Sequence, residues 1–128
     1  FRPIIAHPER NAAIQRDPEI LVRLVEKGVL AQLNTGSLLG HYGPEAYEAV
    51  KVVLDRSLAH VLASDAHSAS GLRRPIMTDG VEAAAQLVGE EKAWAMVTTV
   101  PQAILEGKQV EVPEPLAKPV HRRFFGMF

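Results

Sequence analysis

Two short stretches of the sequence combine a hydrophobic run with side chains that could do chemistry. His7, Glu9 and Arg10 follow an apolar run at the start of the chain, and Asp65 and His67 follow the run AHVLAS. Charged groups are costly to bury unless they are paired or bound to a metal. Such residues at the end of a buried strand therefore indicate a site.

The imidazole and carboxylate groups indicate a metal site without sulfur ligands, because the sequence contains no cysteine. Asp65 and His67 are two residues apart, so their side chains point to the same side of an extended segment. With His7, they form a set of nitrogen and oxygen donors that suits manganese, iron or zinc. A capping aspartate beside a surface histidine is the alternative interpretation of this pair.

Arginines near these residues indicate that the ligand carries an oxyanion. Arg10 has no acceptor and cannot bind a metal, but its planar guanidinium matches a phosphate. Arg73 or Arg74, in the segment GLRRP, could reach the same phosphate or remain solvated. Metal ligands beside Arg10 predict metal-assisted phosphate-ester hydrolysis, in which a metal-bound water attacks phosphorus and no serine or cysteine nucleophile is needed.

Three other polar positions have less defined roles. Glu9 could form an exposed salt bridge with Arg10, or support a metal ligand from behind. Asn34 begins a stretch of small residues, 34–37, that either lets the backbone approach a ligand closely or makes a plain strand-to-helix turn. His60 alternates away from Asp65 in a regular strand, so we expect it to pack against a helix.

The hydrophobic pattern predicts an α/β fold that brings these residues together. Apolar runs at residues 3–7, 29–34 and 59–64 are typical of parallel strands covered by helices on both faces. Ligands bind at the carboxyl ends of strands in such sheets, where the candidate residues fall. Trp94 is expected in the core. Helices are predicted at residues 18–27 (capped by Asp17), 44–56, 79–88, 90–97 and 101–107, the last capped by Thr99.

The composition narrows the class of protein. The chain has 128 residues, 47% apolar and 23% charged, with a net charge of −1, which is typical of one globular domain and gives no reason to expect a nucleic-acid partner. No apolar run approaches the length of a membrane span. The absence of cysteine fits a cytoplasmic protein. The sequence does not begin with methionine, so the numbering could start within a longer protein.

Four segments resemble the bacterial capsule-regulating tyrosine phosphatases of the polymerase-and-histidinol-phosphatase (PHP) superfamily. They are IIAHPERN, LNTGSLLGHYG, LASDAHS with RRPIM, and VPQAILEGKQV, in the same order and spacing over about residues 2–112. The resemblance implies the C-terminal part of a distorted (β/α)7 barrel. It also implies a manganese-dependent site of the trinuclear type that hydrolyses phosphotyrosine on a bacterial tyrosine kinase controlling capsule and exopolysaccharide synthesis.

The resemblance also implies roles for individual residues. His7, Asp65 and His67 correspond to metal ligands, and Arg10 corresponds to a residue that contacts the substrate phosphate. Arg10 and Asp65 are therefore the expected catalytic residues. The residues expected near the phosphate with less certain roles are Asn34, Arg73 and Arg74.

The family's N-terminal ligands, an H-x-H pair, a further histidine and two glutamates, have no counterpart in residues 1–128. We therefore expect this chain alone to bind metal weakly or not at all and to have little activity. A cut barrel would leave two exposed strand edges, which predicts homo-oligomerisation. Residues 1–112 are expected to be the phosphatase portion and residues 113–128 an extended basic and aromatic tail, which is either a disordered end or a segment that touches a membrane or a partner.

Two other functions remain open from the sequence. The first keeps the fold but changes the substrate to histidinol phosphate or another small phosphomonoester. The second is a non-catalytic module that binds a kinase.

Overall fold

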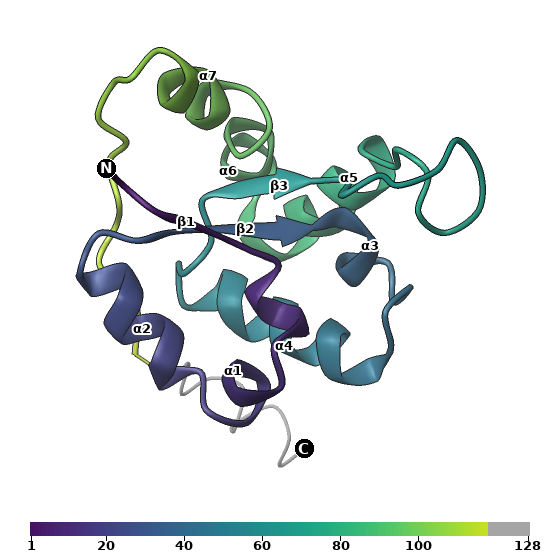
Figure 1. The fold of residues 1–128 in the computed structure, drawn as a ribbon, viewed down its shortest axis with the longest axis horizontal. Helices are drawn as coiled ribbons and strands as arrows, with labels where there is room; N and C mark the ends of the chain where they lie inside the picture. Colours follow the sequence, from purple (N-terminus) through teal and green to yellow (C-terminus); the bar gives the residue numbers. More distant parts are fainter. Residues whose placement is uncertain (118–128) are drawn as a thin grey trace.

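A parallel sheet of three strands lies at the centre of the computed structural model, which describes residues 1–117 (Figure 1). The strands are β1 (Ile4–Ala6), β2 (Leu30–Asn34) and β3 (Val61–Ala63), in the order β1-β2-β3. Both pairings are parallel. The predicted α/β class and all three predicted strands are confirmed, and each strand is shorter than its apolar run.

Helices connect the strands and cover the sheet. In Figure 1, α1, α2 and α4 lie on one side of the sheet, whereas α6 and α7 lie on the other. The predicted helices are present, and three short ones, η1, α1 and α3, were not predicted. The helices are η1 (Pro8–Arg10), α1 (Ala12–Arg16), α2 (Glu19–Glu26), α3 (Thr35–Leu38), α4 (Pro44–Asp55), α5 (Thr78–Val88), α6 (Glu90–Ala95) and α7 (Thr99–Leu105).

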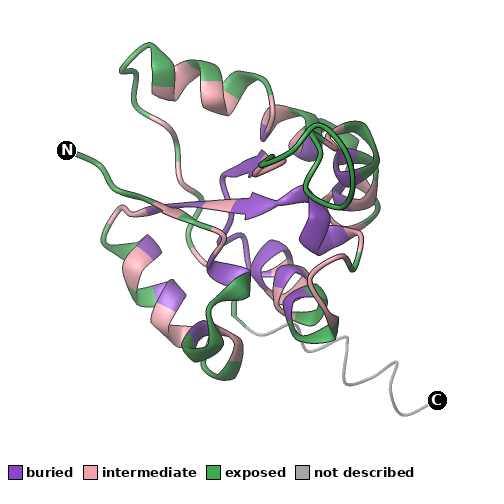
Figure 2. Ribbon diagram, turned by 45° about the vertical axis from the view of Figure 1, so that its right-hand side comes forward, coloured by how far each residue is buried: buried purple, intermediate pink, exposed green. Residues whose placement is uncertain are grey.

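The core forms where the apolar stripes of the helices meet the sheet. Leu21 and Val25 of α2 are buried, as are Val50 and Val53 of α4. These positions recur every three or four residues, which places them on one face of each helix. Figure 2 shows buried residues on the central strands and on the inner faces of the helices. This packing fixes the ends of the strands, where the candidate site residues lie.

The two edges of the sheet differ. β1 has a strand neighbour on one side only, and Ile4 remains 43% exposed. At the other edge, the Leu62 amide of β3 donates a hydrogen bond of 3.1 Å to the Met96 carbonyl. β3 is therefore an edge strand that the end of α6 covers in part, whereas β1 is the open edge.

The α6–α7 region differs from its sequence prediction in two details. Trp94 is 43% exposed and lies outside the core, because α6 turns Ala93 and Met96 inward instead. The last helix begins at Thr99, so Thr99 is its first residue and not its cap. The cap of the first predicted helix is shifted as well: Pro18 is the N-cap of α2, and Asp17, one residue before it, accepts a hydrogen bond from the Glu19 amide through its Oδ1.

A buried arginine fastens the chain after the last helix. Arg56 is 4% exposed, and its Nε donates to the Leu116 carbonyl at 2.9 Å while its Nη1 donates to Glu19 at 2.7 Å. The Leu116 amide donates to the Arg56 carbonyl. Residues 113–117 are thus tied to the domain, whereas the aromatic part of the predicted tail lies outside the described residues. None of the described helices has the length and hydrophobicity that a membrane span requires.

Candidate functional site

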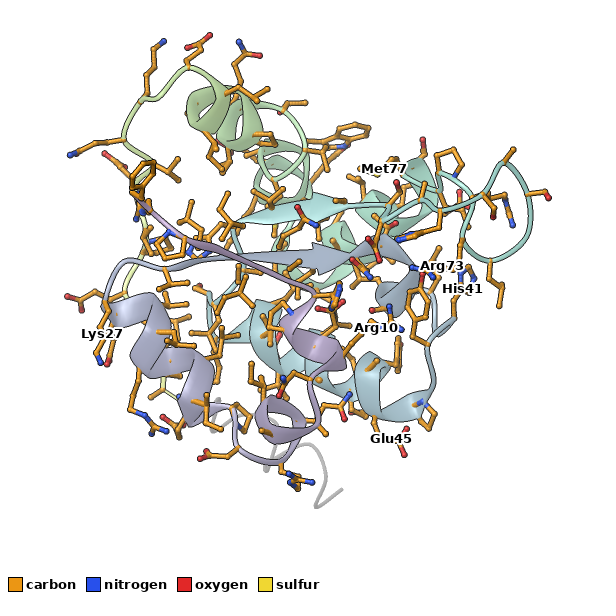
Figure 3. All side chains as sticks on the ribbon, viewed as in Figure 1. Arg10, Lys27, His41, Glu45, Arg73 and Met77 are labelled. Atoms are coloured by element: carbon orange, nitrogen blue, oxygen red, sulfur yellow. The ribbon has the colours of Figure 1, made fainter. Side chains whose placement is uncertain are left out.

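The candidate residues follow the carboxyl ends of all three strands. His7 comes directly after β1, Asn34 ends β2, and Asp65 lies two residues after β3. Figure 3 places Arg10 and Arg73 on the side of the molecule where the strands end, and Lys27 at the opposite end. Parallel strands bring their carboxyl ends to one edge of the sheet, so the predicted convergence on one edge is confirmed.

Asp65 is the centre of a small polar cluster at this edge. Its Oδ2 accepts a hydrogen bond of 3.3 Å from Asn34 Nδ2 and lies 3.5 Å from Arg73 Nη2. Its Oδ1 lies 3.9 Å from His67 Nδ1. Arg74 instead donates to the Gly71 carbonyl within its own loop. The structure therefore brings Arg73 to the cluster and leaves Arg74 outside it.

The proton on His67 decides whether this side chain can bind a metal. Nδ1 lies 2.6 Å from the Asp65 carbonyl oxygen and 2.8 Å from Arg73 Nη2. A ring nitrogen can donate to the first or accept from the second, but not both. With the proton on Nδ1, donated to the carbonyl, Nε2 keeps its lone pair and is free to bind a metal.

The backbone is left-handed at two of the candidate residues. The φ angles of His7 and Asp65 are 40° and 51°. Only Ser57, before β3 at the other end of the sheet, shares this feature among described non-glycine residues. This conformation costs about 1–3 kcal/mol and persists where the surroundings enforce it, often at functional sites. At His7 the enforcement includes a 2.8 Å hydrogen bond from its amide to the Gln32 carbonyl.

The donor set suits a metal in chemistry but is incomplete. Within residues 1–117, no three His, Asp or Glu side chains are grouped to hold one ion. His7 therefore does not complete a three-ligand set with Asp65 and His67. The carboxylate and imidazole donors fit manganese, iron or zinc, but a full coordination sphere needs further ligands.

Glu9 has a role that the sequence interpretation missed. It is fully buried, and its Oε1 accepts hydrogen bonds from the Asn34 amide at 2.9 Å and from Ser37 Oγ at 2.7 Å. The expectation of an exposed salt bridge with Arg10 is wrong, because η1 turns Glu9 inward. Burial raises the pKa of Glu9, and the two hydrogen bonds partly oppose this rise. Glu9 fastens η1 to the start of α3.

Residues 34–37 support the candidate site from the interior of the domain and do not line its surface. All four are buried, and Asn34 is 0% exposed. Its side-chain amide donates to Asp65 and orients it, and the expected contact between Asn34 and phosphate stays a prediction. Thr35 Oγ1 donates to the Ile76 carbonyl and packs on Gly80 of α5, which holds the loop containing Asp65 against β2.

Arg10 projects from η1 onto an aromatic ring. Its guanidinium carbon lies 4.2 Å from the centre of the Tyr42 ring, in the loop between α3 and α4. A cavity of about 310 Å³ beside β1 is lined by His7 and Arg10 among others. A groove of about 440 Å³ between α1 and α4 contains none of the candidate residues.

His60 lies away from this edge, as predicted. It is 4% exposed, and its Nδ1 accepts a hydrogen bond of 2.9 Å from the Ala31 amide. Burial, with smaller contributions from Arg2 and Lys92, lowers the pKa of His60 to about 4. His60 is therefore neutral at pH 7 and stabilises the sheet.

Comparison with known proteins identifies the family. Residues 1–106 match the family model described as capsular polysaccharide synthesis, CpsB/CapC. The chain belongs to the CpsB/CapC family. It is 34% identical to a putative tyrosine-protein phosphatase, CapC, of Staphylococcus aureus over 99% of its own length, and 32% identical to the tyrosine-protein phosphatase YwqE of Bacillus subtilis over 100%.

A solved structure of this family shares the fold. It comes from the crystal structures of YwqE from Bacillus subtilis and CpsB from Streptococcus pneumoniae, described as unique metal-dependent tyrosine phosphatases. The TM-score is 0.85 at 29% identity, over 93% of this chain and 47% of the other. The chain likewise spans 49% of the length of CapC and of YwqE, or about half of the relatives it matches.

Proposed function

We propose that this chain forms the C-terminal part of a metal-dependent protein-tyrosine phosphatase that acts on a bacterial tyrosine kinase in capsule synthesis, in the cytoplasm. The observation that carries the proposal is the cluster of Asp65, His67 and Arg73 at the sheet edge that also carries His7 and Arg10. The names of the family relatives support the same activity. In this proposal, β1 pairs along its open edge with a strand from the rest of a distorted (β/α)7 barrel.

The residues of the chain have distinct tasks in the proposed reaction. Asp65, His67 and His7 would hold the metal, manganese in our proposal, together with ligands from the rest of the protein. When bound, the metal supplies Lewis-acid activation of the phosphoryl oxygen and lowers the pKa of a bound water. Asn34 orients Asp65, and the Asp65 carbonyl orients His67.

Two arginines complete the proposed site. Arg10 binds the oxygens of the phosphate through its N–H edge, which suits a tetrahedral oxyanion. Arg73 Nη2 lies 3.5 Å from Asp65, and its guanidinium would be available to pair with the phosphate if Asp65 were bound to a metal. Both arginines stabilise negative charge that develops in the transition state.

The test measures metal content and hydrolysis of a phosphotyrosine peptide by the complete gene product and by this chain alone. We expect activity in the complete protein with added manganese, and a drop of at least about 100-fold in kcat/KM for Asp65→Asn and for Arg10→Ala. Arg74→Ala is the matched control and should retain activity, because Arg74 bonds only within its loop. Full activity of Asp65→Asn, or faster turnover of small phosphomonoesters, would contradict the proposal.

A further inference from the structure

We propose that Tyr42 is a positioning residue that holds Arg10 in the orientation in which it binds the phosphate of phosphotyrosine. This inference rests on the proposed function. Tyr42 lies 32 positions from Arg10 in the sequence, in a segment with no charged or metal-binding group of its own except His41. The contact between the Arg10 guanidinium and the Tyr42 ring, at 4.2 Å, is what joins them.

The Tyr42 ring packs closely against Gly36 of α3. A Cβ at Gly36 would lie 2.7 Å from Tyr42 Cε2, so only glycine leaves room for the ring at this point of α3. The hydroxyl of Tyr42 is buried and has no hydrogen-bond partner among the described residues. The aromatic face, and not the hydroxyl, is therefore the part of Tyr42 that the surroundings use.

Arg10 is free to bind an anion while it rests on this ring. A cation–π contact uses the face of the guanidinium and leaves the N–H edge open. Within residues 1–117, Arg10 has no ion pair with a carboxylate. Holding a long side chain in one geometry before binding reduces the rotamer entropy that binding would otherwise remove.

The short helix α3 holds η1 in two ways. Ser37 of α3 donates to buried Glu9, the residue before Arg10, and Gly36 of α3 seats the ring under Arg10. Glu9 thus fixes the backbone of η1, while Tyr42 fixes the side chain that projects from it. Together, Glu9 and Tyr42 explain how Arg10, in a helix of three residues at the end of β1, keeps a defined orientation.

The test uses the complete gene product and measures KM and kcat for a phosphotyrosine peptide and Ki for inorganic phosphate. Tyr42→Phe keeps the ring, so all three values should stay within about two-fold. Tyr42→Leu should raise Ki for phosphate and lower kcat/KM by about ten-fold. Tyr42→Leu should add nothing further in an Arg10→Ala background, because both changes remove the same interaction.

The matched control is Tyr47→Leu. The Tyr47 ring also carries a cation, Lys51 Nζ at 4.5 Å, but it lies on α4 and has no contact with Arg10 among those found. Tyr47→Leu should leave Ki for phosphate unchanged. If Tyr42→Leu fails to fold, fluorinated phenylalanines at position 42 replace it. Each added fluorine weakens the ring's attraction for a cation without removing the ring, so Ki should rise stepwise.

The outcomes separate this inference from the proposed function. If Arg10→Ala keeps normal Ki and kcat/KM, the assigned role of Arg10 is wrong and both proposals fail. If Arg10→Ala is impaired while Tyr42→Leu and the fluorinated series behave like the natural protein, only the role of Tyr42 is overturned. An additive effect of Tyr42→Leu and Arg10→Ala would also overturn it.

Discussion

Replacing Glu9 tests whether a buried carboxylate fastens η1 to the site. Glu9→Ala removes the acceptor for the Asn34 amide and for Ser37 Oγ, which would leave two buried donors unpaired. Each unpaired donor costs about 1–3 kcal/mol. We therefore expect Glu9→Ala to lower the free energy of unfolding by about 3–5 kcal/mol. Glu9→Gln keeps an oxygen in place of Oε1 and should cost less than about 1.5 kcal/mol at pH 7.

The pH dependence gives a second measure of the same residue. Burial raises the pKa of Glu9 above its ordinary value of 4.5. Between 4.5 and the raised pKa, the folded protein binds a proton that the unfolded chain has released, so stability falls as pH rises through this interval. Glu9→Gln cannot titrate. The stability of the natural protein relative to Glu9→Gln should therefore decrease with rising pH.

Urea unfolding at several pH values between 4 and 8, followed by circular dichroism, measures both effects. Taking the difference between the natural protein and Glu9→Gln cancels the titration of all other groups, His60 included. A difference that stays constant, or that increases with pH, would refute the assignment of the raised pKa. A Glu9→Ala variant as stable as the natural protein would refute the fastening role.

Two further predictions concern the supports of the site. Gly80→Ala should lower stability by about 1–3 kcal/mol in thermal unfolding, because a Cβ there would lie 2.3 Å from Thr35 Cβ, and an unchanged melting temperature would contradict this packing. For His60, whose pKa is lowered from 6.5 to about 4, the folded protein binds fewer protons than the unfolded chain below pH 6.5, so stability should fall by roughly 3 kcal/mol as pH drops from 6.5 to 4. His60→Asn, which keeps an acceptor for the Ala31 amide, should remove most of this fall.

Local patterns in the sequence were sufficient to predict most helices and strands and to identify the side chains that could bind a metal. Apolar runs and helical spacing depend on neighbouring residues, so the strands and the longer helices could be predicted. Parallel strands end at one edge, which placed His7, Asp65 and Arg10 together without knowledge of side-chain packing. The short helices were missed because each has fewer than two turns and gives no periodic signal.

Contacts between distant segments could not be predicted in this way. The exposure of Trp94 depends on which face of α6 packs against α5, and the choice between Arg73 and Arg74 depends on how the loop after Asp65 folds back. Sequence spacing alone does not distinguish a buried from an exposed Trp94, or Arg73 from Arg74. Tertiary contacts distinguish them: Arg73 lies beside His67 and Asp65, whereas Arg74 donates to the Gly71 carbonyl.

The sequence by itself determined which groups are available to this protein: nitrogen and oxygen donors without thiolates, and an arginine a few residues after a strand. The tertiary structure decided how they are held. Glu9 turns inward to bind residues 25 and 28 positions away, and Arg10 turns outward onto Tyr42. The physical reason is that burial, hydrogen bonding and ring contacts are properties of space, and segments far apart in the sequence become neighbours only when the chain folds.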